Sequence, residues 1–378
     1  MAEPFKNRIN PEVVAHLART LDAAMGAQGV PFRADVFQEH ALAGLTDLEL
    51  KARVNQVAAA LDAALPSAGR DIRAIGRALE AASGPAIPTA EGVTDGFSAW
   101  PLITWVERHA TDTPEAALDI LEALTDRFSS EFAVRPYLIA HPELAWAAVS
   151  RWADHDNLHV RRLASEGPRP RLPWGVQLKD SIEDPSRGLA ILDRLVDDPE
   201  LYVRRSVANH LGDVAKDHPD RAAAHAGRWL AEREDRLWVV KHGLRHLIKQ
   251  GHPGALEVLG FGPPKLRVDG PLTVSPRIQL GDGLSIALTL VSTADTPQKL
   301  VIDLGIHFVK KRGDRRPKVF KWSTRTLKAG ERVSLSRVLT LKPVSTRRHY
   351  PGVQGIDVRI NGEIVADSEF FLDCEPGA

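Results

Sequence analysis

The sequence predicts a mainly α-helical solenoid over residues 1–262, followed by a small all-β sandwich over residues 268–378. Three observations support this fold class. Apolar residues recur at helical spacing through the first part, and a short motif repeats irregularly within it. After Gly260 the helical spacing and the motif end, and apolar and polar residues alternate. The 378 residues suffice for two or more domains, and 43% hydrophobic with 26% charged residues is typical of a globular protein.

The helical part contains a weak internal repeat in its second half. Its cores are centred on Val134, Val160, Val203 and Val239, with intervals of 26, 43 and 36 residues, and Asp-Pro or His-Pro turns lie between them. Helical pairs of this size resemble HEAT-like repeats, which stack into a curved solenoid with a concave binding face. Pro and Gly cluster over 84–101 and predict a loop between helices.

The last 110 residues show the alternation expected of short β-strands. We expect strands over 285–291, 300–309, 333–341 and 358–364, with turn signals at 281–283, 313–314, 329–331 and 361–362. Several short strands at this spacing favour an immunoglobulin-like sandwich, here of the type without a cysteine pair, because Cys374 is the only cysteine.

Three acidic residues occupy comparable places in the repeats. Glu131 precedes a predicted helix start, and Glu166 and Asp213 each follow a Val-Arg-Arg segment by about two helical turns. Capping or ion pairing is the simpler role for any one of them, because acids are common at helix starts and beside arginines. Three acids on equivalent faces of consecutive repeats are harder to explain in that way.

Arginines surround these acids. Arg161, Arg162, Arg204 and Arg205 begin helices, where anions are favoured, and Arg169 and Arg171 lie in a proline-rich segment. The first arginine of each Val-Arg-Arg pair has an equally good structural role, as the partner of an aspartate in the neighbouring repeat. The second arginine of each pair and the two loop arginines suit phosphates, and for Arg161 both roles stay open. The candidate DNA contacts are therefore Arg161, Arg162, Arg205, Arg169 and Arg171.

Trp174 follows Pro173 at the end of the same proline-rich segment. Four other tryptophans, Trp146, Trp152, Trp229 and Trp238, lie in helical segments and are expected in the core. Trp174 lies outside any periodic pattern, so a core position and a face that packs on a base or sugar are both open. Together with the arginines and acids it suggests a protein that handles cationic, damaged nucleic acid.

The C-terminal part carries enough positive charge to bind a polyanion. Residues 263–378 hold 19 lysines and arginines against 12 acids, a net charge of +7, although the whole chain is neutral. Seven positive charges lie within residues 310–321, at a predicted hairpin tip. A solubilising edge loop is the plain alternative, but the density favours phosphate contact by Lys310, Lys311, Arg312, Arg315 and Arg316.

Several functional classes lack support. With one cysteine the chain has no internal disulfide and no cysteine-type zinc site. No third ligand joins His242 and His246, and no phosphate-binding loop or nucleophile elbow is present. We expect neither metal nor cofactor. The N-terminus does not resemble a signal peptide, and no apolar run approaches about 20 residues, so we expect a cytoplasmic protein without membrane contact.

Three long motifs, Phe128–Pro136, Val160–Trp174 and Val203–Pro219, resemble the AlkC family of bacterial alkylation-repair DNA glycosylases. The order of helical repeats and immunoglobulin-like domain matches one branch of that family. The resemblance implies excision of 3-methyladenine and 3-methylcytosine from double-stranded DNA, by a monomer acting at the nucleoid. It assigns the lesion-contacting acids to Glu131, Glu166 and Asp213, the aromatic contact to Trp174 and the backbone contact to Arg162. It also implies that the base is not flipped into a deep cavity.

The chemistry of these residues agrees with that implication. A 3-methylated base is already cationic and leaves without protonation, so carboxylates beside the developing oxocarbenium sugar and an oriented water are what the reaction needs. We choose Asp213 as the carboxylate that positions the water. Apart from Lys216 the motifs hold no lysine for a Schiff base, so we expect a monofunctional enzyme. The alternative is a non-enzymatic HEAT scaffold that binds protein or DNA.

Overall fold

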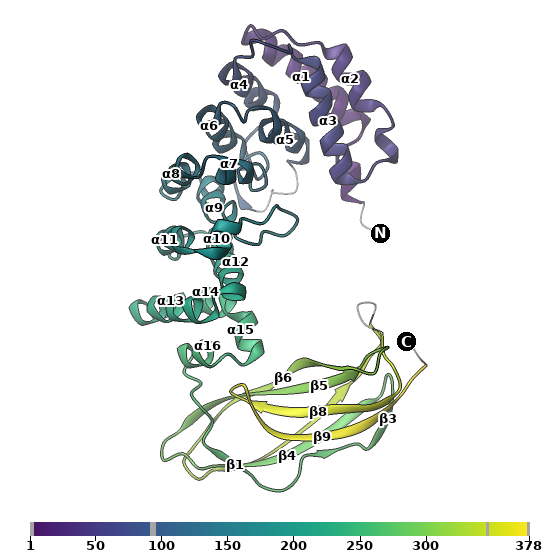
Figure 1. Ribbon diagram of the computed structural model, residues 1–378, viewed down its shortest axis with the longest axis vertical. Coiled ribbons are helices and arrows are strands. Elements are labelled where there is room, and N and C mark those ends of the chain that lie inside the picture. The colour runs from purple at the N-terminus through teal and green to yellow at the C-terminus, as the bar shows by residue number, and fades with distance from the viewer. Residues whose placement is uncertain (1–3, 91–95, 345–347, 376–378) are drawn as a thin grey trace. The chain divides into compact units, whose positions relative to one another are not determined.

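The computed structural model describes residues 4–90, 96–344 and 348–375 (Figure 1). They form two compact units, residues 1–217 and 218–378, each with its own internal packing. The predicted fold class is confirmed: helices fill the chain as far as Val258, and strands follow from Leu266. No helix in the described part of the chain is long and apolar enough to cross a membrane.

The first unit is a series of helices that pack on their neighbours along the chain. Prolines at the first turn and side-chain caps start many of them, because neither disturbs helical hydrogen bonding there. Asn10 caps α1 through the Val13 amide, and Asn157 caps α9 through the His159 amide. The helices are α1 (Pro11–Ala27), α2 (Ala34–Leu42), α3 (Leu50–Ala64), α4 (Ile72–Ala82), α5 (Trp100–His109), α6 (Pro114–Leu124), α7 (Arg135–Ala140), α8 (Pro142–Trp152), α9 (Leu158–Glu166), α10 (Lys179–Glu183), α11 (Ser186–Leu195) and α12 (Leu201–Asp217).

Two details of this unit extend the sequence prediction. The predicted 84–101 loop ends earlier, because α5 begins at Trp100 and accepts Pro101 in its first turn. Part of that loop, residues 91–95, lies outside the described residues. Helix α9, which carries the first Val-Arg-Arg segment, packs against α8, α11 and α12, so the repeats that carry the candidate acids are in direct contact.

The second unit begins with helices and ends with strands. Its helices are α13 (Pro219–Glu232), α14 (Leu237–Gly243), α15 (Arg245–Gln250) and α16 (Pro253–Val258), and α13 packs on α16.

The tryptophans expected in the core have different surroundings. Trp152 on α8 and Trp229 on α13 are buried, and Trp146 on α8 is half-buried. Trp238 on α14 is 42% exposed and stacks on His242. The helical spacing of Trp238 indicated a buried face, but its ring lies at the edge of a short helix.

Two sheets form the sandwich (Figure 1). Strand β4 pairs with β1 and β2 on one side and β7 on the other, and the second sheet has the order β3-β9-β8-β5-β6. Alternating residues of β4, among them Leu284, Ile286 and Leu288, are buried in the core that the two sheets share. The strands are β1 (Leu266–Val268), β2 (Thr273–Val274), β3 (Arg277–Gln279), β4 (Gly283–Ser292), β5 (Gln298–Val309), β6 (Arg315–Leu327), β7 (Arg332–Thr340), β8 (Gly352–Ile360) and β9 (Glu363–Asp373).

The strand predictions are confirmed in three places and wrong in one. Three expected strands are found within one or two residues, in β4, β5 and β7. The expected strand over 358–364 is wrong, because β8 ends at Ile360 and β9 starts at Glu363, whereas the turn expected at Asn361 and Gly362 is confirmed. Asn361 and Gly362 between them have φ of 48° and 85°, the left-handed backbone of a two-residue hairpin turn.

Candidate active site

The three candidate acids come from three packed segments of the first unit. Glu131 lies in the turn before α7, Glu166 is the last residue of α9, and Asp213 lies in the last turns of α12. Helix α9 packs on α12, which brings the ends of the two Val-Arg-Arg segments together. The acids therefore meet through tertiary packing, although they are far apart in the sequence.

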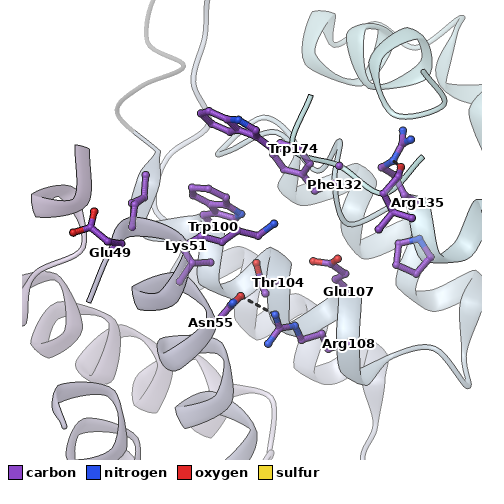
Figure 2. A pocket seen from close by; sticks show the side chains of 15 residues that line it. Glu49, Lys51, Asn55, Trp100, Thr104, Glu107, Arg108, Phe132, Arg135 and Trp174 are labelled. Atoms are coloured by element: carbon purple, nitrogen blue, oxygen red, sulfur yellow. Dashed lines mark hydrogen bonds between the residues drawn. The ribbon is translucent and has the colours of Figure 1, made fainter. Parts of the chain in front are cut away.

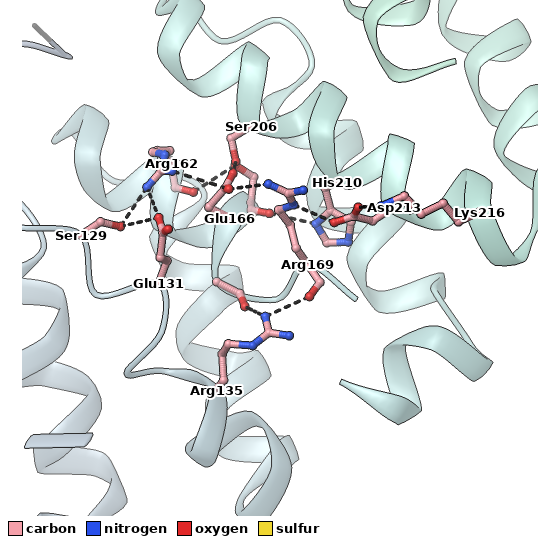
Figure 3. A network of polar contacts seen from close by, with 12 residues as sticks. Ser129, Glu131, Arg135, Arg162, Glu166, Arg169, Ser206, His210, Asp213 and Lys216 are labelled. Carbon is pink, nitrogen blue, oxygen red and sulfur yellow. Dashed lines mark hydrogen bonds and ion pairs between the residues drawn. The ribbon is translucent and has the colours of Figure 1, made fainter. Parts of the chain in front are cut away.

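Two arginines join the acids into one chain of ion pairs (Figure 3). Arg162 Nη1 donates to Glu131 Oε2 at 2.5 Å, and its Nη2 lies 3.6 Å from Glu166 Oε1. Arg169 Nη1 donates to Glu166 Oε1 at 2.6 Å, and its Nε donates to Asp213 Oδ2 at 2.8 Å. Acids and arginines therefore alternate in this series of ion pairs, which begins at Glu131 and ends at Asp213.

Lys216 completes this chain at its far end. Its Nζ donates to Asp213 Oδ1 at 2.8 Å, so each oxygen of Asp213 accepts a charged hydrogen bond. Asp213 is only 2% exposed, whereas the Lys216 side chain is 46% exposed. Lys216 is thus the more accessible of the two cations on this carboxylate.

The central acid is held ionised by its surroundings. Burial alone would raise the pKa of Glu166, but Arg162 and Arg169 act against burial, and the net pKa lies below its usual value. Ser206 Oγ donates to Glu166 Oε2 at 2.6 Å and contributes in the same direction. The pKa of Arg162 is raised: burial opposes the charge, and Glu131 and Glu166 more than offset that effect.

A buried polar layer supports the acids from α12. His210 Nδ1 lies 2.9 Å from the Ser165 carbonyl oxygen, and burial lowers the pKa of His210 to about 4. Ser165 Oγ donates to Ser206 Oγ at 2.6 Å. The guanidinium of Arg162 lies 5.0 Å from the centre of the Tyr202 ring, a cation–π distance. These contacts restrict the rotamers of Arg162 and of the residues around Glu166.

Trp174 lies on the segment that links α9 to α10. It is 87% exposed, so the core position left open by the sequence is excluded. Its φ of 65° places a bulky residue in the left-handed region, an uncommon conformation that is found where the surrounding structure enforces it. The indole is therefore presented to solvent at a position that folding by itself does not favour.

Arg135, which sequence analysis did not single out, holds this segment in place. Its Nη1 donates to the carbonyls of Gly167 and Arg169 at 2.6 and 2.9 Å, and its Nε donates to the Val176 carbonyl at 2.6 Å. It therefore joins the two ends of the segment that carries Trp174. Burial lowers the pKa of Arg135 to about 10. In the sequence, Arg135 stands directly before a proline in a repeat core. An arginine at this place is usually expected to form an ion pair with the neighbouring HEAT-like repeat, so its contacts with backbone carbonyls were not predicted.

The other candidate arginines have different surroundings. Arg161 pairs with Asp198 at 2.6 Å, the structural role that competes with DNA binding. Arg171 makes two hydrogen bonds of 2.7 Å to Asp217. Arg205 is exposed on α12. Among the candidate arginines of the helical part, Arg205 is thus the most accessible. Arg162 and Arg169 are both paired with carboxylates.

The basic run lies in the second unit, at the tip of the β5–β6 hairpin. The Gly313 amide donates to the Lys310 carbonyl at 2.8 Å, which closes the turn. Lys311 and Arg312 are exposed there, and Arg315 pairs with Glu369 at 2.6 Å. The side chain of Arg316 lies outside the described residues. The tip thus presents a dense positive charge to solvent.

The described residues hold no group of three or more His, Cys, Asp or Glu side chains placed to bind a metal ion. The chemistry that Glu131, Glu166 and Asp213 offer is electrostatic, and the segment after α9 adds an exposed indole at Trp174. Carboxylates stabilise a positive charge that develops on a sugar or is already present on a base, and an indole face packs on either.

Comparison with known proteins places this chain in a family. Residues 267–374 match the family model described as the C-terminal Ig-like domain of the uncharacterised protein YhaZ. Uncharacterised YhaZ of Bacillus subtilis is 41% identical over 271 residues, which are 71% of this chain and 75% of that protein.

A solved structure covers nearly the whole chain. The alkylpurine DNA glycosylase AlkC of Pseudomonas fluorescens, bound to DNA with an abasic site analogue, is 35% identical. It superimposes with a TM-score of 0.80 over 98% of this chain and 100% of its own. With the fold, the length and the order of the two kinds of structure in agreement, the chain belongs to the AlkC family of DNA glycosylases.

Proposed function

We propose that this protein excises cationic N-alkylated bases, 3-methyladenine and 3-methylcytosine, from double-stranded DNA by hydrolysing the N-glycosidic bond. One observation carries the proposal: Glu131, Glu166 and Asp213 lie in one series of ion pairs, and the segment between α9 and α10 that supplies Arg169 to this series also exposes Trp174. The similarity to a DNA-bound alkylpurine glycosylase supports DNA as the partner. The helical part, residues 1–262, would do the chemistry, and residues 268–378 would add DNA affinity.

A cationic lesion needs no general acid. The methylated base leaves as a neutral molecule, and the barrier lies in the positive charge that develops on the deoxyribose. Asp213 would stabilise this charge and orient the attacking water, while Glu131 and Glu166 add to the negative field and steer the lesion. Trp174 would pack against the sugar or base. The acids lie along stacked helical repeats, which fits an enzyme that does not flip the base into a deep cavity.

The ion pairs describe the enzyme before it meets DNA. Both oxygens of Asp213 are occupied, by Arg169 and Lys216. A DNA phosphate is a strong competitor for an arginine or lysine. Binding of the backbone would therefore draw cations away from the acids, and the cationic lesion would replace them. Arg162 and Arg169 would then neutralise the phosphates that flank the lesion.

Lys216 is the residue on which the monofunctional assignment depends. Its amine donates to Asp213 before DNA binds, and in this proposal it leaves Asp213 for a DNA phosphate, where it is again an ion-pair partner. A Schiff-base nucleophile must instead be a neutral amine. Water is therefore the nucleophile in this proposal, and the DNA strand is left intact, with an abasic site as the product.

The decisive experiment is single-turnover excision from a duplex that carries one 3-methylcytosine, repeated with 3-methyladenine. We expect release of the free base and an abasic strand that breaks only after alkali. The matched control is the same duplex with the unmodified base. If the protein binds the duplexes and releases no base from either methylated substrate, the catalytic proposal fails and a non-enzymatic scaffold remains.

A further inference from the structure

A pocket of about 410 Å³ lies next to Trp174, and none of the three acids of the ion-pair chain lines it. Its walls come from α3, α5, the turn before α7 and the segment that carries Trp174 (Figure 2). The volume is within the roughly 300–1,000 Å³ of small-molecule sites. Trp174 is the one lining residue that the proposed chemistry uses, so the rest of the lining, on α3, α5 and α7, needs a separate explanation.

Aromatic rings make up much of the wall. Trp100, Phe132 and Trp174 all line the pocket. Trp100 is held in place by stacking on Phe128, with ring centres 5.1 Å apart and planes at 20°, and it also stacks on Phe132 at 6.3 Å. Fixed aromatic faces beside an exposed indole are the platform on which proteins stack unpaired nucleobases.

One carboxylate lies among these rings. Glu107 lies on the same face of α5 as Trp100 and Thr104, seven and three residues away. Within the described residues no hydrogen bond or ion pair involves its carboxylate, and burial raises its pKa against the opposing effect of Arg108 and Lys51. A partly buried acid without a partner is costly to keep, so a ligand that donates a hydrogen bond to it would stabilise the site.

Cations complete the lining. Lys51 and Arg108 are exposed residues of the pocket, and Arg108 Nη2 donates to Asn55 Oδ1 at 2.7 Å. Glu49, the other acid of the lining, is already paired with Lys6 at 2.7 Å. The pocket therefore combines stacking faces and an available acceptor with positive charge, which is the set of groups that a single nucleotide needs.

We propose that this pocket binds one unstacked nucleobase that carries an exocyclic amino group, with Trp174 and Trp100 against its face and Glu107 accepting from the amino group. The inference rests on the proposed function, which supplies DNA as the partner. Adenine N6 and cytosine N4 are donors to such a carboxylate, whereas thymine presents a carbonyl oxygen at the same place and is repelled. The nearby cations would hold the phosphate.

The test is the binding of deoxynucleoside monophosphates, followed by quenching of tryptophan fluorescence. We expect dAMP and dCMP to bind the wild-type protein roughly tenfold more tightly than dTMP, the discrimination of one well-placed hydrogen bond. Glu107→Gln should abolish that preference, because an amide can donate as well as accept. Glu49→Gln is the matched control, since Glu49 lines the same pocket but is paired, and it should keep the preference.

A second assay finds the source of the base. In a duplex with an abasic site analogue, only the base opposite the gap lacks a partner. If affinity depends on whether that base is adenine, cytosine or thymine, and Glu107→Gln removes the dependence, the pocket takes the opposite base. If nucleotides discriminate and these duplexes do not, the pocket takes the alkylated base itself, and the part of the proposed function that excludes base flipping is wrong. Absence of base preference in both assays, or a preference that survives Glu107→Gln, overturns the proposal.

These assays need no cleavage of a glycosidic bond. A protein that fails to excise either methylated base but discriminates nucleotides through Glu107 would refute the proposed function and leave the pocket assignment standing. The opposite result, excision without any base preference, would refute the pocket assignment alone. The thermal unfolding of Glu107→Gln provides the folding control, and we expect no loss of stability because a carboxylate without a partner is removed.

Discussion

Replacing Asp213 by asparagine removes one negative charge from the centre of the proposed chemistry and leaves the shape unchanged. The structure adds a constraint to this substitution. Asp213 accepts from Arg169 on one oxygen and from Lys216 on the other. Asparagine has a single oxygen, so it can keep only one of these bonds. We expect it to keep the buried Arg169, because Lys216 is half exposed and can turn to water.

The expected magnitudes follow from these hydrogen bonds. Removing one preorganised electrostatic interaction costs about 2.7–4 kcal/mol in the barrier, which is a decrease of roughly 10²–10³ in the rate of excision. The stability cost should be smaller, about 1.5–3 kcal/mol, the value of a hydrogen bond to a charged group. The protein should therefore stay folded and bind the lesion duplex while the chemical step nearly stops.

The assay is single-turnover excision at saturating enzyme, with unfolding measured in parallel. Asp217→Asn is the matched control, because Asp217 lies four residues further on α12 and pairs with Arg171 through two hydrogen bonds of 2.7 Å. That variant disrupts a comparable ion pair and should change the rate of the chemical step by only a few-fold. A near wild-type rate for Asp213→Asn, or an equal decrease in both variants, would show that Asp213 does not act on the reacting sugar.

Three further predictions follow from the same structure. Trp174→Ala should slow excision while changing the free energy of unfolding by within about 0.5 kcal/mol, because the ring is 87% exposed; a decrease of several kcal/mol in denaturant titrations would contradict this. Burial lowers the pKa of His210 from 6.5 in the unfolded chain to about 4 in the folded protein, so about 3 kcal/mol of stability that is present above pH 6.5 is lost as the pH falls to 4. His210→Asn should flatten that part of the plot of unfolding free energy against pH, and an unchanged plot would contradict this. Neutralising Lys310, Lys311 and Arg312 should weaken binding to damaged and normal duplex alike and lower the slope of log K against log salt by roughly 0.9 for each phosphate that is no longer neutralised, and an unchanged slope would make this tip a solubilising loop.

The order of helices and strands was predictable because it depends on local patterns. Helical spacing of apolar residues, prolines at first turns and period-two alternation each act over a few residues, and they placed the change from helix to strand close to Gly260. The error at 358–364 is of the same local kind. The alternation over 358–364 was interpreted as one strand, although Asn361 and Gly362 within it are a turn signal and have the left-handed backbone of a turn.

The residues of the candidate site could also be predicted from the sequence, because acids, arginines and a tryptophan are concentrated in a few short motifs. Glu131, Glu166, Asp213 and Trp174 all lie in three long motifs. What the motifs did not show is how these acids are paired. Arg169 stays a predicted DNA contact, and its sequence context did not show that it bridges Glu166 and Asp213. A bridging role depends on the packing of α9 against α12, which no single motif contains.

By itself, the sequence determined the class of fold, the family resemblance and the chemical groups available to the site. Only the tertiary structure decided that Trp174 is exposed, that Arg135 joins both ends of its segment, and that Glu107 lines a pocket of aromatic rings with no partner among the described residues. The physical reason is one of range. Propensity and periodicity act between neighbours in the chain, whereas burial, pairing and the pKa of a carboxylate depend on groups that packing brings together from distant parts of the sequence.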